Sequence, residues 1–206
     1  MTEQATTSVP TSLDRGGWDD CLLWLIRKLG PIYKLAELVT TVRVVVQGRS
    51  MEPNFTTDQL QDGPRHLDYL LVSRLALWSG DISRGDVAVL RNPSHLRQTY
   101  IKRIVGLPGD RVGTVTGRVF INDVLLEEPY LGVPLDDSDL DRLQQLISEG
   151  HIQEWSLGEE QYFVMGDNRA ADTAVDSRSF GPVNRHLIVG KAWIRYWPRS
   201  AWGIVS

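Results

Sequence analysis

The sequence predicts a mainly β protein built on an antiparallel sheet, with short helices near the N-terminus and one helical insertion. Short runs rich in β-branched residues alternate with turn residues along most of the chain, which is typical of strands. Eighteen glycines and 10 prolines among 206 residues supply the turns. Apolar residues recur at helical spacing before Val42 and in an insertion at about residues 129–160.

The residues before Val42 divide into a tail and a helical segment. Residues 1–17 are polar and rich in Ser and Thr, and we expect a flexible tail. Residues 18–41 are expected to form an amphipathic helical segment in two pieces, Trp18–Leu29 and Ile32–Thr41. A Gly-Pro pair separates the two pieces, because these residues end helices.

Residues 42–206 are expected to form one β domain, in which Gly, Pro, Asn and Asp bound the strands. The expected strands are Val42–Gln47, Leu67–Leu77, Asp86–Arg91, Thr99–Val105, Val112–Val115, Arg118–Ile121, Gln161–Val164 and Leu187–Trp197. The insertion predicts a helix over Asp136–Gly150, since four apolar residues share one face: Leu140, Leu143, Leu146 and Ile147.

Composition and charge exclude several functional classes. The chain has 42% hydrophobic and 23% charged residues, which is ordinary for a globular protein. Its net charge of −4 disfavours a nucleic-acid-binding protein, which normally carries a basic excess. One cysteine, Cys21, excludes a disulfide framework and a multi-cysteine zinc site, and the four histidines lack metal-ligand spacing. We therefore expect no metal, no cofactor and no nucleic-acid partner.

Three segments rich in Gly, Pro and polar residues lie where strands are expected to end. They are Gln47–Pro53, Tyr100–Asp110, and Met165–Arg169 continued by Asp176–Gly181. Each one alone is ordinary turn sequence. Together and in this order they resemble the bacterial signal peptidase I family. The segments of that family have the forms S-G-x-S-M-x-P-T, then K-R-V-x-G-x-P-G-D, then G-D-N-R followed by D-S-R and a glycine.

The resemblance runs from about Val42 to Trp197. It includes a fourth segment, Arg84–Val89, in which a Gly-Asp pair opens a strand. It implies that the β domain, residues 42–206, is an antiparallel catalytic core of the signal peptidase/repressor-protease type.

The resemblance also implies a serine–lysine dyad, with Ser50 as the nucleophile and Lys102 as the general base. A serine hydroxyl is a weak nucleophile and requires an adjacent base. None of the motifs contains a histidine, so a Ser-His-Asp triad is not expected. A lysine acts as a base only when neutral, so desolvation or nearby positive charge must lower its pKa from about 10.4 to about 8. Tyr100, Lys102 and Ile104 share one face of the expected strand, and apolar neighbours there would supply that desolvation.

The serine segment supplies the expected oxyanion and substrate contacts. The backbone N–H of Ser50 is the expected donor to the oxyanion. In some relatives a serine two positions before the nucleophile adds a hydroxyl, and this chain has Gly48 instead. Gly48 leaves room for a peptide backbone to approach. Met51 is expected to shape the turn and to wall the pocket.

The third segment is expected to form a supporting loop that contains Asp167, Asn168, Arg169, Thr173, Asp176, Ser177 and Arg178. Six residues separate its two halves, where the family usually has four. Thr173 is the only hydroxyl residue among these six and is our candidate for the group that orients Lys102. A carboxylate in that place, such as Asp172, would raise the pKa of the lysine and oppose the mechanism. We expect Asp176 and Arg178 to form a structural pair that holds the loop against the dyad.

The resemblance implies a serine endopeptidase that removes signal peptides from secretory preproteins after a small residue, at an Ala-x-Ala type of site. The substrate would add as a strand beside Val42–Gly48 and Thr99–Lys102. Two related alternatives stay open: a processing peptidase of the same superfamily with one dedicated substrate, and a self-cleaving repressor-type protease. A non-catalytic binding protein on the same scaffold is disfavoured by the presence of both Ser50 and Lys102.

Members of the family normally have one or more membrane-spanning helices before the serine segment. Here the longest charge-free run between Cys21 and Arg49 is Cys21–Ile26, whereas spanning requires about 20 apolar residues. We therefore expect residues 18–41 to lie on the membrane surface, with the catalytic domain on the extracytoplasmic face. Further aromatic contacts could come from Trp193, Trp197 and Trp202. A soluble form is the alternative, and the oligomeric state stays open.

Overall fold

The structure is a computed structural model that describes residues 41–55, 57–58, 66–74, 77, 82–132, 134–170 and 175–205. Three sequence predictions lie outside the described residues: the tail at 1–17, the helical segment at 18–41 up to Thr40, and the position of Thr173.

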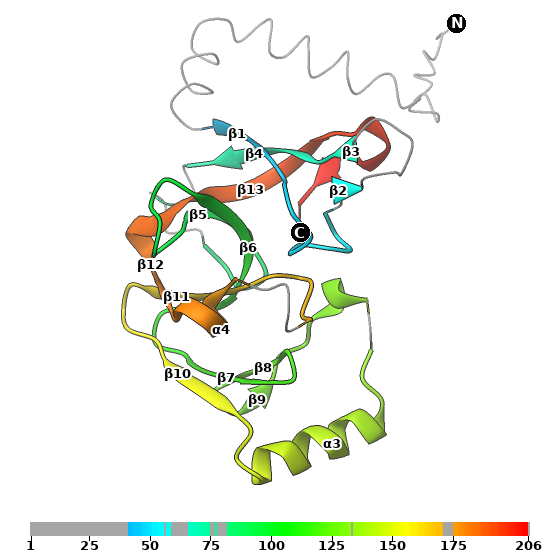
Figure 1. Ribbon diagram of the computed structural model, residues 1–206, viewed down its shortest axis with the longest axis vertical. Helices are drawn as coiled ribbons and strands as arrows, with labels where there is room; N and C mark the ends of the chain where they lie inside the picture. Colours follow the sequence, from blue (N-terminus) through cyan, green and yellow to red (C-terminus); the bar gives the residue numbers. More distant parts are fainter. Residues whose placement is uncertain are drawn as a thin grey trace, which may run out of the picture. The chain divides into compact units, whose positions relative to one another are not determined.

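The larger sheet of the described chain has eight strands, which pair antiparallel. Its order is β1 (Thr41–Val45), β4 (Tyr69–Ser73), β13 (Ile188–Trp197), β5 (Val87–Arg91), β6 (Thr99–Gly106), β11 (Gln161–Met165) and β12 (Val183–Asn184), with β14 (Gly203–Ile204) beside β13 (Figure 1). Strand β6 pairs with β5 through Thr99–Arg103 but with β11 only through Arg103–Gly106. Among the described residues, the first half of β6 therefore has one unpaired edge, and β1 lies at the edge of the sheet.

A four-stranded antiparallel sheet lies between β6 and β11 in the chain. Its order is β10 (Gln153–Ser156), β7 (Arg111–Val115), β8 (Arg118–Ile121) and β9 (Val124–Leu125). The turns of its two hairpins are Thr116-Gly117 and Asn122-Asp123, and all four residues have positive φ. That backbone geometry matches the twist of the flanking strands, so these tight turns favour hairpins. A separate ribbon of β2 (Thr57–Asp58) and β3 (His66–Leu67) precedes β4.

The insertion between β9 and β10 contains the predicted helix. Helix α3, Asp137–Ser148, lies beside the small sheet and follows a 3-10 turn, η1 (Pro129–Leu131) (Figure 1). Asp136 and Asp139 form a capping box at its first turn, which satisfies backbone donors that the helix leaves free. Leu143 is buried on its inner face, whereas Leu140 is partly exposed.

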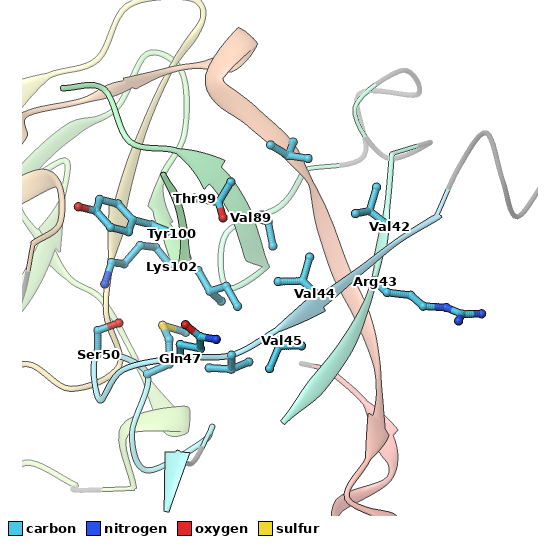
Figure 2. Close-up of a pocket in the computed structure, with 14 residues that line it drawn as sticks. Val42, Arg43, Val44, Val45, Gln47, Ser50, Val89, Thr99, Tyr100 and Lys102 are labelled. Atoms are coloured by element: carbon cyan, nitrogen blue, oxygen red, sulfur yellow. The ribbon is translucent and has the colours of Figure 1, made fainter. Parts of the chain in front are cut away.

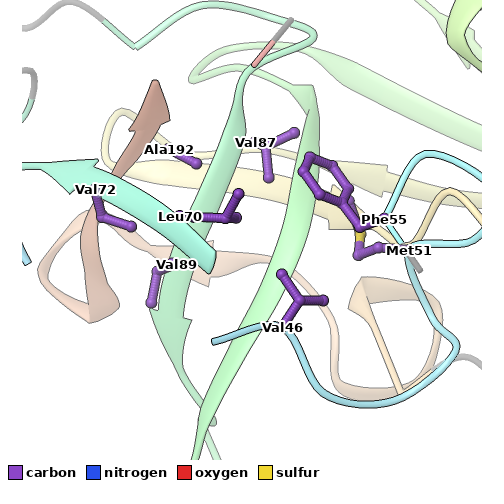
Figure 3. Close-up of a cluster of buried hydrophobic side chains, with 8 residues drawn as sticks. All are labelled: Val46, Met51, Phe55, Leu70, Val72, Val87, Val89 and Ala192. Carbon is purple, nitrogen blue, oxygen red and sulfur yellow. The ribbon is translucent and has the colours of Figure 1, made fainter. Parts of the chain in front are cut away.

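Buried apolar clusters fix the two sheets and the loop after β1. In one cluster Met51 and Phe55, 1% and 3% exposed, pack with Val46, Leu70, Val72, Val87, Val89 and Ala192 (Figure 3). Another cluster joins β6 and β11 to the small sheet through Val105, Val112, Val119, Leu157, Phe163 and Met165. The first cluster matters most for function, because it anchors both sides of the serine segment.

The predicted antiparallel β fold is confirmed, and one predicted strand is corrected. The sequence predicts a single strand over Leu67–Leu77, but β3 ends at Leu67 and β4 runs only over Tyr69–Ser73. Asp68 lies between the two strands: it is buried, its side chain pairs with Arg195, and its carbonyl accepts from the N–H of Val46 at 2.8 Å, in continuation of the β1–β4 register. The short strands β9, β10, β12 and β14 were not predicted, since two to four residues give little periodic signal.

Candidate active site

Ser50 lies in the loop that follows β1. The chain leaves the strand at Val46 and turns at Gly48, whose φ of 88° is a conformation that glycine adopts readily. After Ser50 the chain turns again, and the N–H of Phe55 donates to the carbonyl of Met51 at 2.9 Å. Since Met51 and Phe55 are buried in the core, the loop that presents Ser50 is anchored directly behind it.

Lys102 lies in the middle of β6, opposite Ala88 of β5, and is 3% exposed. Burial lowers the pKa of its amine from 10.5 to about 8. Nearby charges act in both directions on this pKa: Asp176 and Asp167 raise it, and Arg178 lowers it. Desolvation has the largest effect on this pKa, and it favours the neutral amine that a general base requires.

Ser50 and Lys102 line the same pocket, which has a volume of about 470 Å³. Figure 2 shows the Lys102 amine extending toward Ser50, with the ring of Tyr100 beside it. The distance from Lys102 Nζ to the centre of that ring is 5.8 Å. The pocket walls come mainly from Val42–Gln47 and Thr99–Lys102. These residues fall within Val42–Gly48 and Thr99–Lys102, the segments expected to flank a substrate, but Gly48 is not among the lining residues. The structure thus brings together the two predicted dyad residues, with Met51 at the same pocket.

The Gly166–Asn168 segment packs on the backbone of the serine loop. The N–H of Asn168 donates to the carbonyl of Ser50 at 3.1 Å, and its side-chain amide donates to the carbonyl of Arg49 at 3.2 Å. Gly166 lies so close that a Cβ atom there would overlap the Ser50 carbonyl oxygen. This close approach gives a physical reason for glycine at position 166.

Asp176 and Arg178 form a buried ion pair that anchors the same segment. Arg178 Nε and NH2 donate to the two Asp176 oxygens at 3.0 and 2.8 Å. Asp176 also accepts from the N–H of Gly166 at 3.1 Å, and Ser177 Oγ accepts from the N–H of Val164 at 3.0 Å. The sequence predicts a loop throughout this segment, and this prediction is corrected: Asp176 caps a short helix, α4 (Ser177–Phe180).

Asp167 is held by two residues that the site prediction missed. Arg103 Nε and NH2 donate to its two oxygens at 2.8 and 2.7 Å, and both side chains are almost fully buried. Asn54 Nδ2 donates to the same carboxylate at 2.8 Å. The signal that could have identified Arg103 is a charged residue inside an apolar run of β6, because a buried charge requires a partner.

Arg169 joins the supporting loop to the small sheet and to the turn before α3. It donates to the carbonyl of Gly117 at 2.7 Å and binds the buried carboxylate of Glu128 with two nitrogens. The hydroxyl of Tyr130 donates to Glu128, and burial together with Glu128 raises the pKa of this hydroxyl above its usual value. No local sequence pattern indicates that Glu128 and Tyr130 belong to the site, because the contact that brings them there joins Glu128 to Arg169, 41 residues away.

The roles of the predicted site residues stay predictions. Thr173 is our candidate for orienting Lys102, and residues 171–174 lie outside the described residues.

Comparison with known proteins places the chain in a family. The family model described as "Signal peptidase, peptidase S26" matches residues 26–197. The chain belongs to this family. As a member of the signal peptidase family it is a serine peptidase, and so a hydrolase.

Several curated signal peptidases are similar to it over most of its length. Signal peptidase I of Bacillus caldolyticus is 33% identical over 161 residues, covering 75% of this chain and 78% of that protein. Signal peptidase I U of Bacillus subtilis strain 168 is 31% identical over 179 residues, covering 81% and 84%. A crystal structure of a signal peptidase I from Enterococcus faecalis V583 is 30% identical, with a TM-score of 0.38, and the match covers 53% of this chain and 95% of that chain.

Within the described part of this signal peptidase family member, no helix has the length and hydropathy needed to cross a membrane.

Proposed function

We propose that this protein removes signal peptides from secretory preproteins, cutting after a small residue at an Ala-x-Ala type of site. Ser50 is the nucleophile and Lys102 the general base. The observation that carries the proposal is a buried lysine, with its pKa lowered to about 8, in the same pocket as the candidate serine. The relatives named signal peptidase I support the choice of substrate.

The proposed chemistry is acyl transfer in two steps. Neutral Lys102 takes the proton of the Ser50 hydroxyl while Oγ attacks the scissile carbonyl carbon. The backbone N–H of Ser50 stabilises the oxyanion, and the protonated lysine then gives its proton to the departing amine. In the second step Lys102 removes a proton from water, which attacks the acyl carbon. The bond from that carbon to Ser50 Oγ then breaks, Lys102 returns the proton to Oγ, and the signal peptide is released as a carboxylic acid.

The unpaired strand edges at the pocket support binding of an extended peptide. β1 lies at the edge of the sheet, and the Thr99–Lys102 half of β6 has no partner on one side among the described residues. A peptide between them can form backbone hydrogen bonds, which give affinity without regard to its side chains. Val42, Val44 and Val89 are among the apolar residues that line this space, which favours small aliphatic side chains in the substrate.

A membrane surface is the second proposed partner, with the catalytic domain on the extracytoplasmic face. Trp193, Trp197 and Trp202 are 41%, 46% and 52% exposed, and Ile204 is 84% exposed. Trp193 and Trp197 lie on β13, and Ile204 lies on β14, which pairs with β13. Trp202 directly precedes β14. Tryptophan suits the boundary of a bilayer, because it combines an apolar ring with a polar N–H.

The direct test is incubation of the purified protein with a preprotein that carries an Ala-x-Ala site, followed by mass spectrometry of the products. We expect one cut after the second alanine, and none with Ser50→Ala or Lys102→Ala. A matched preprotein with large residues in place of both alanines is the specificity control. Cleavage by Ser50→Ala would refute the dyad. Failure to cut several unrelated preproteins would favour the dedicated-substrate alternative.

A further inference from the structure

Asn54 lies where three parts of the structure meet. Its Nδ2 donates to Asp167 Oδ2 and to the backbone carbonyl of Tyr130, both at 2.8 Å. Its own backbone carbonyl accepts from Arg195 at 2.9 Å. Asn54 is four residues beyond Ser50, at the place where the serine segment S-G-x-S-M-x-P-T of the family ends in threonine. The chain therefore departs from that pattern at a residue that hydrogen-bonds to three other parts of the structure.

The carboxylate that Asn54 binds is also tied to the lysine strand. Arg103 directly follows Lys102 in β6 and holds both oxygens of Asp167. A continuous path of bonds thus runs from the serine loop through Asn54, Asp167 and Arg103 to the lysine. The neighbours of Asp167 add a second connection, since Gly166 and Asn168 contact the Ser50 carbonyl.

The turn before α3 reinforces this arrangement on both sides. The carbonyl of Tyr130 accepts from Asn54, and the ring of Tyr130 lies against the Arg103 guanidinium, 4.0 Å from its carbon to the ring centre. One residue of η1 therefore contacts both the serine loop and the residue next to the base. A cation on an aromatic face is stabilised, and more so when both are shielded from water.

We infer that Asn54 is a positioning residue: it fixes the serine loop to the Asp167 carboxylate and thereby sets where Ser50 stands relative to Lys102. The inference rests on the proposed function, because it concerns the proposed dyad. Ser50 and Lys102 come from separate elements, and a nucleophile misplaced by about 1 Å can cost about 100-fold in rate.

The side-chain chemistry at position 54 explains why asparagine suits this place. Its amide nitrogen has two N–H donors, one for each of the two acceptors that it meets. Threonine has a single hydroxyl donor and can satisfy one of them at a time. Aspartate has the same shape as asparagine but, when ionised, no donor, and it would add a second carboxylate beside Asp167.

The test compares Asn54→Ala, Asn54→Asp and Asn54→Thr with wild type, using an Ala-x-Ala peptide as substrate. The control is Asn184→Ala, since Asn184 is an exposed asparagine on β12, at the far end of the sheet from β1. We expect Asn54→Ala to lower kcat by about 10- to 100-fold, with KM within about twofold of wild type. Asn54→Thr should retain an intermediate kcat, because one donor remains.

The kcat and melting temperature of Asn54→Ala together separate positioning from a loss of stability, and Asn54→Asp adds a pH readout. Its added charge favours the protonated form of Lys102, so the inflection of the pH–rate profile should move to higher pH. A role in stability alone would lower the melting temperature and leave kcat and the profile of the folded enzyme unchanged. A kcat within about twofold of wild type for Asn54→Ala therefore overturns the inference.

Two further outcomes are distinguishable. If Asn54→Ala does not fold, Asn54→Thr decides, and a kcat equal to wild type overturns the inference. If Ser50→Ala or Lys102→Ala cleaves the peptide, the proposed function itself fails, whatever the Asn54 variants do. If those two variants are inactive and Asn54→Ala has full kcat, only the positioning role fails.

Discussion

The pH dependence of cleavage tests whether Lys102 is the base. Burial lowers the pKa of its amine from 10.5 to about 8. At pH 7 a group with a pKa near 8 is neutral in about one molecule in ten, whereas a lysine of ordinary pKa is neutral in about one in three thousand. Burial therefore increases the active fraction at neutral pH by roughly 300-fold. We expect kcat/KM to rise about tenfold per pH unit and to level off above about pH 8.

A single charge removed near Lys102 should move this profile. Arg178 lowers the pKa of Lys102 and neutralises Asp176, which raises it. Arg178→Gln removes the first effect and leaves the Asp176 carboxylate unpaired, so both changes raise the pKa of the lysine. Each unit of upward shift should reduce kcat/KM at pH 7 by about tenfold, with activity recovered at higher pH. Arg199→Gln, at an exposed arginine in η3 (Arg199–Ala201), is the matched control.

The assay measures initial rates on an Ala-x-Ala peptide from about pH 6 to about pH 10. An inflection near pH 6.5 in wild type would identify a histidine base and refute the role of Lys102. A loss of activity in Arg178→Gln that is equal at every pH would show that Arg178 acts through the backbone that it holds, and not through the pKa of the base.

Further substitutions test the base, the serine loop and the proposed membrane surface separately. Lys102→Arg should be inactive in the peptide assay, because arginine stays protonated. Lys102→Met should also be inactive but should raise the free energy of unfolding by about 3 kcal/mol at pH 7. Below about pH 8 the buried lysine is protonated in the folded protein, and burying that charge costs stability. Above about pH 10.5 the lysine is neutral in both states, so the gain of Lys102→Met in urea titrations should vanish as the pH rises to that value. Gly166→Ala should lower kcat by about tenfold or more, since its Cβ would displace the serine loop, and a kcat equal to wild type contradicts the contact. Among the described residues the exposed tryptophans are Trp193, Trp197 and Trp202. Replacing these three by serine should reduce flotation of the full chain with liposomes, and unchanged flotation would exclude this surface as the membrane contact.

The strands that form the site could be predicted because a short stretch of sequence is enough to indicate each of them. Thr99–Val105 is a β-branched run bounded by turn residues, and the structure has β6 over Thr99–Gly106. The expected helix in the insertion is also present, because its apolar residues repeat at helical spacing and Asp136 caps it. In each case the signal lies within about 15 consecutive residues, where pattern and backbone geometry are directly linked.

The bonds that hold the site together could not be predicted in the same way. Arg103 lies 64 residues from Asp167, and Asn54 lies 113 residues from it. A buried arginine requires an acidic partner. Which of the 26 acidic residues is that partner depends on the tertiary fold, which the sequence pattern does not give. The short helix α4 was missed for a different reason: one turn is too short for periodicity, and only the cap at Asp176 indicated it.

The low pKa of Lys102 depends on how the acids around it are neutralised. Asp176 and Asp167 both raise this pKa, yet each carboxylate is bound by an arginine through two nitrogens. Because each acid is paired, its field at the lysine is reduced, and burial determines the protonation state. The same two acids hold the backbone around Ser50, one through the N–H of Gly166 and the other through Asn54. Because each is paired with an arginine, the two carboxylates can hold the backbone around Ser50 without keeping the nearby Lys102 protonated.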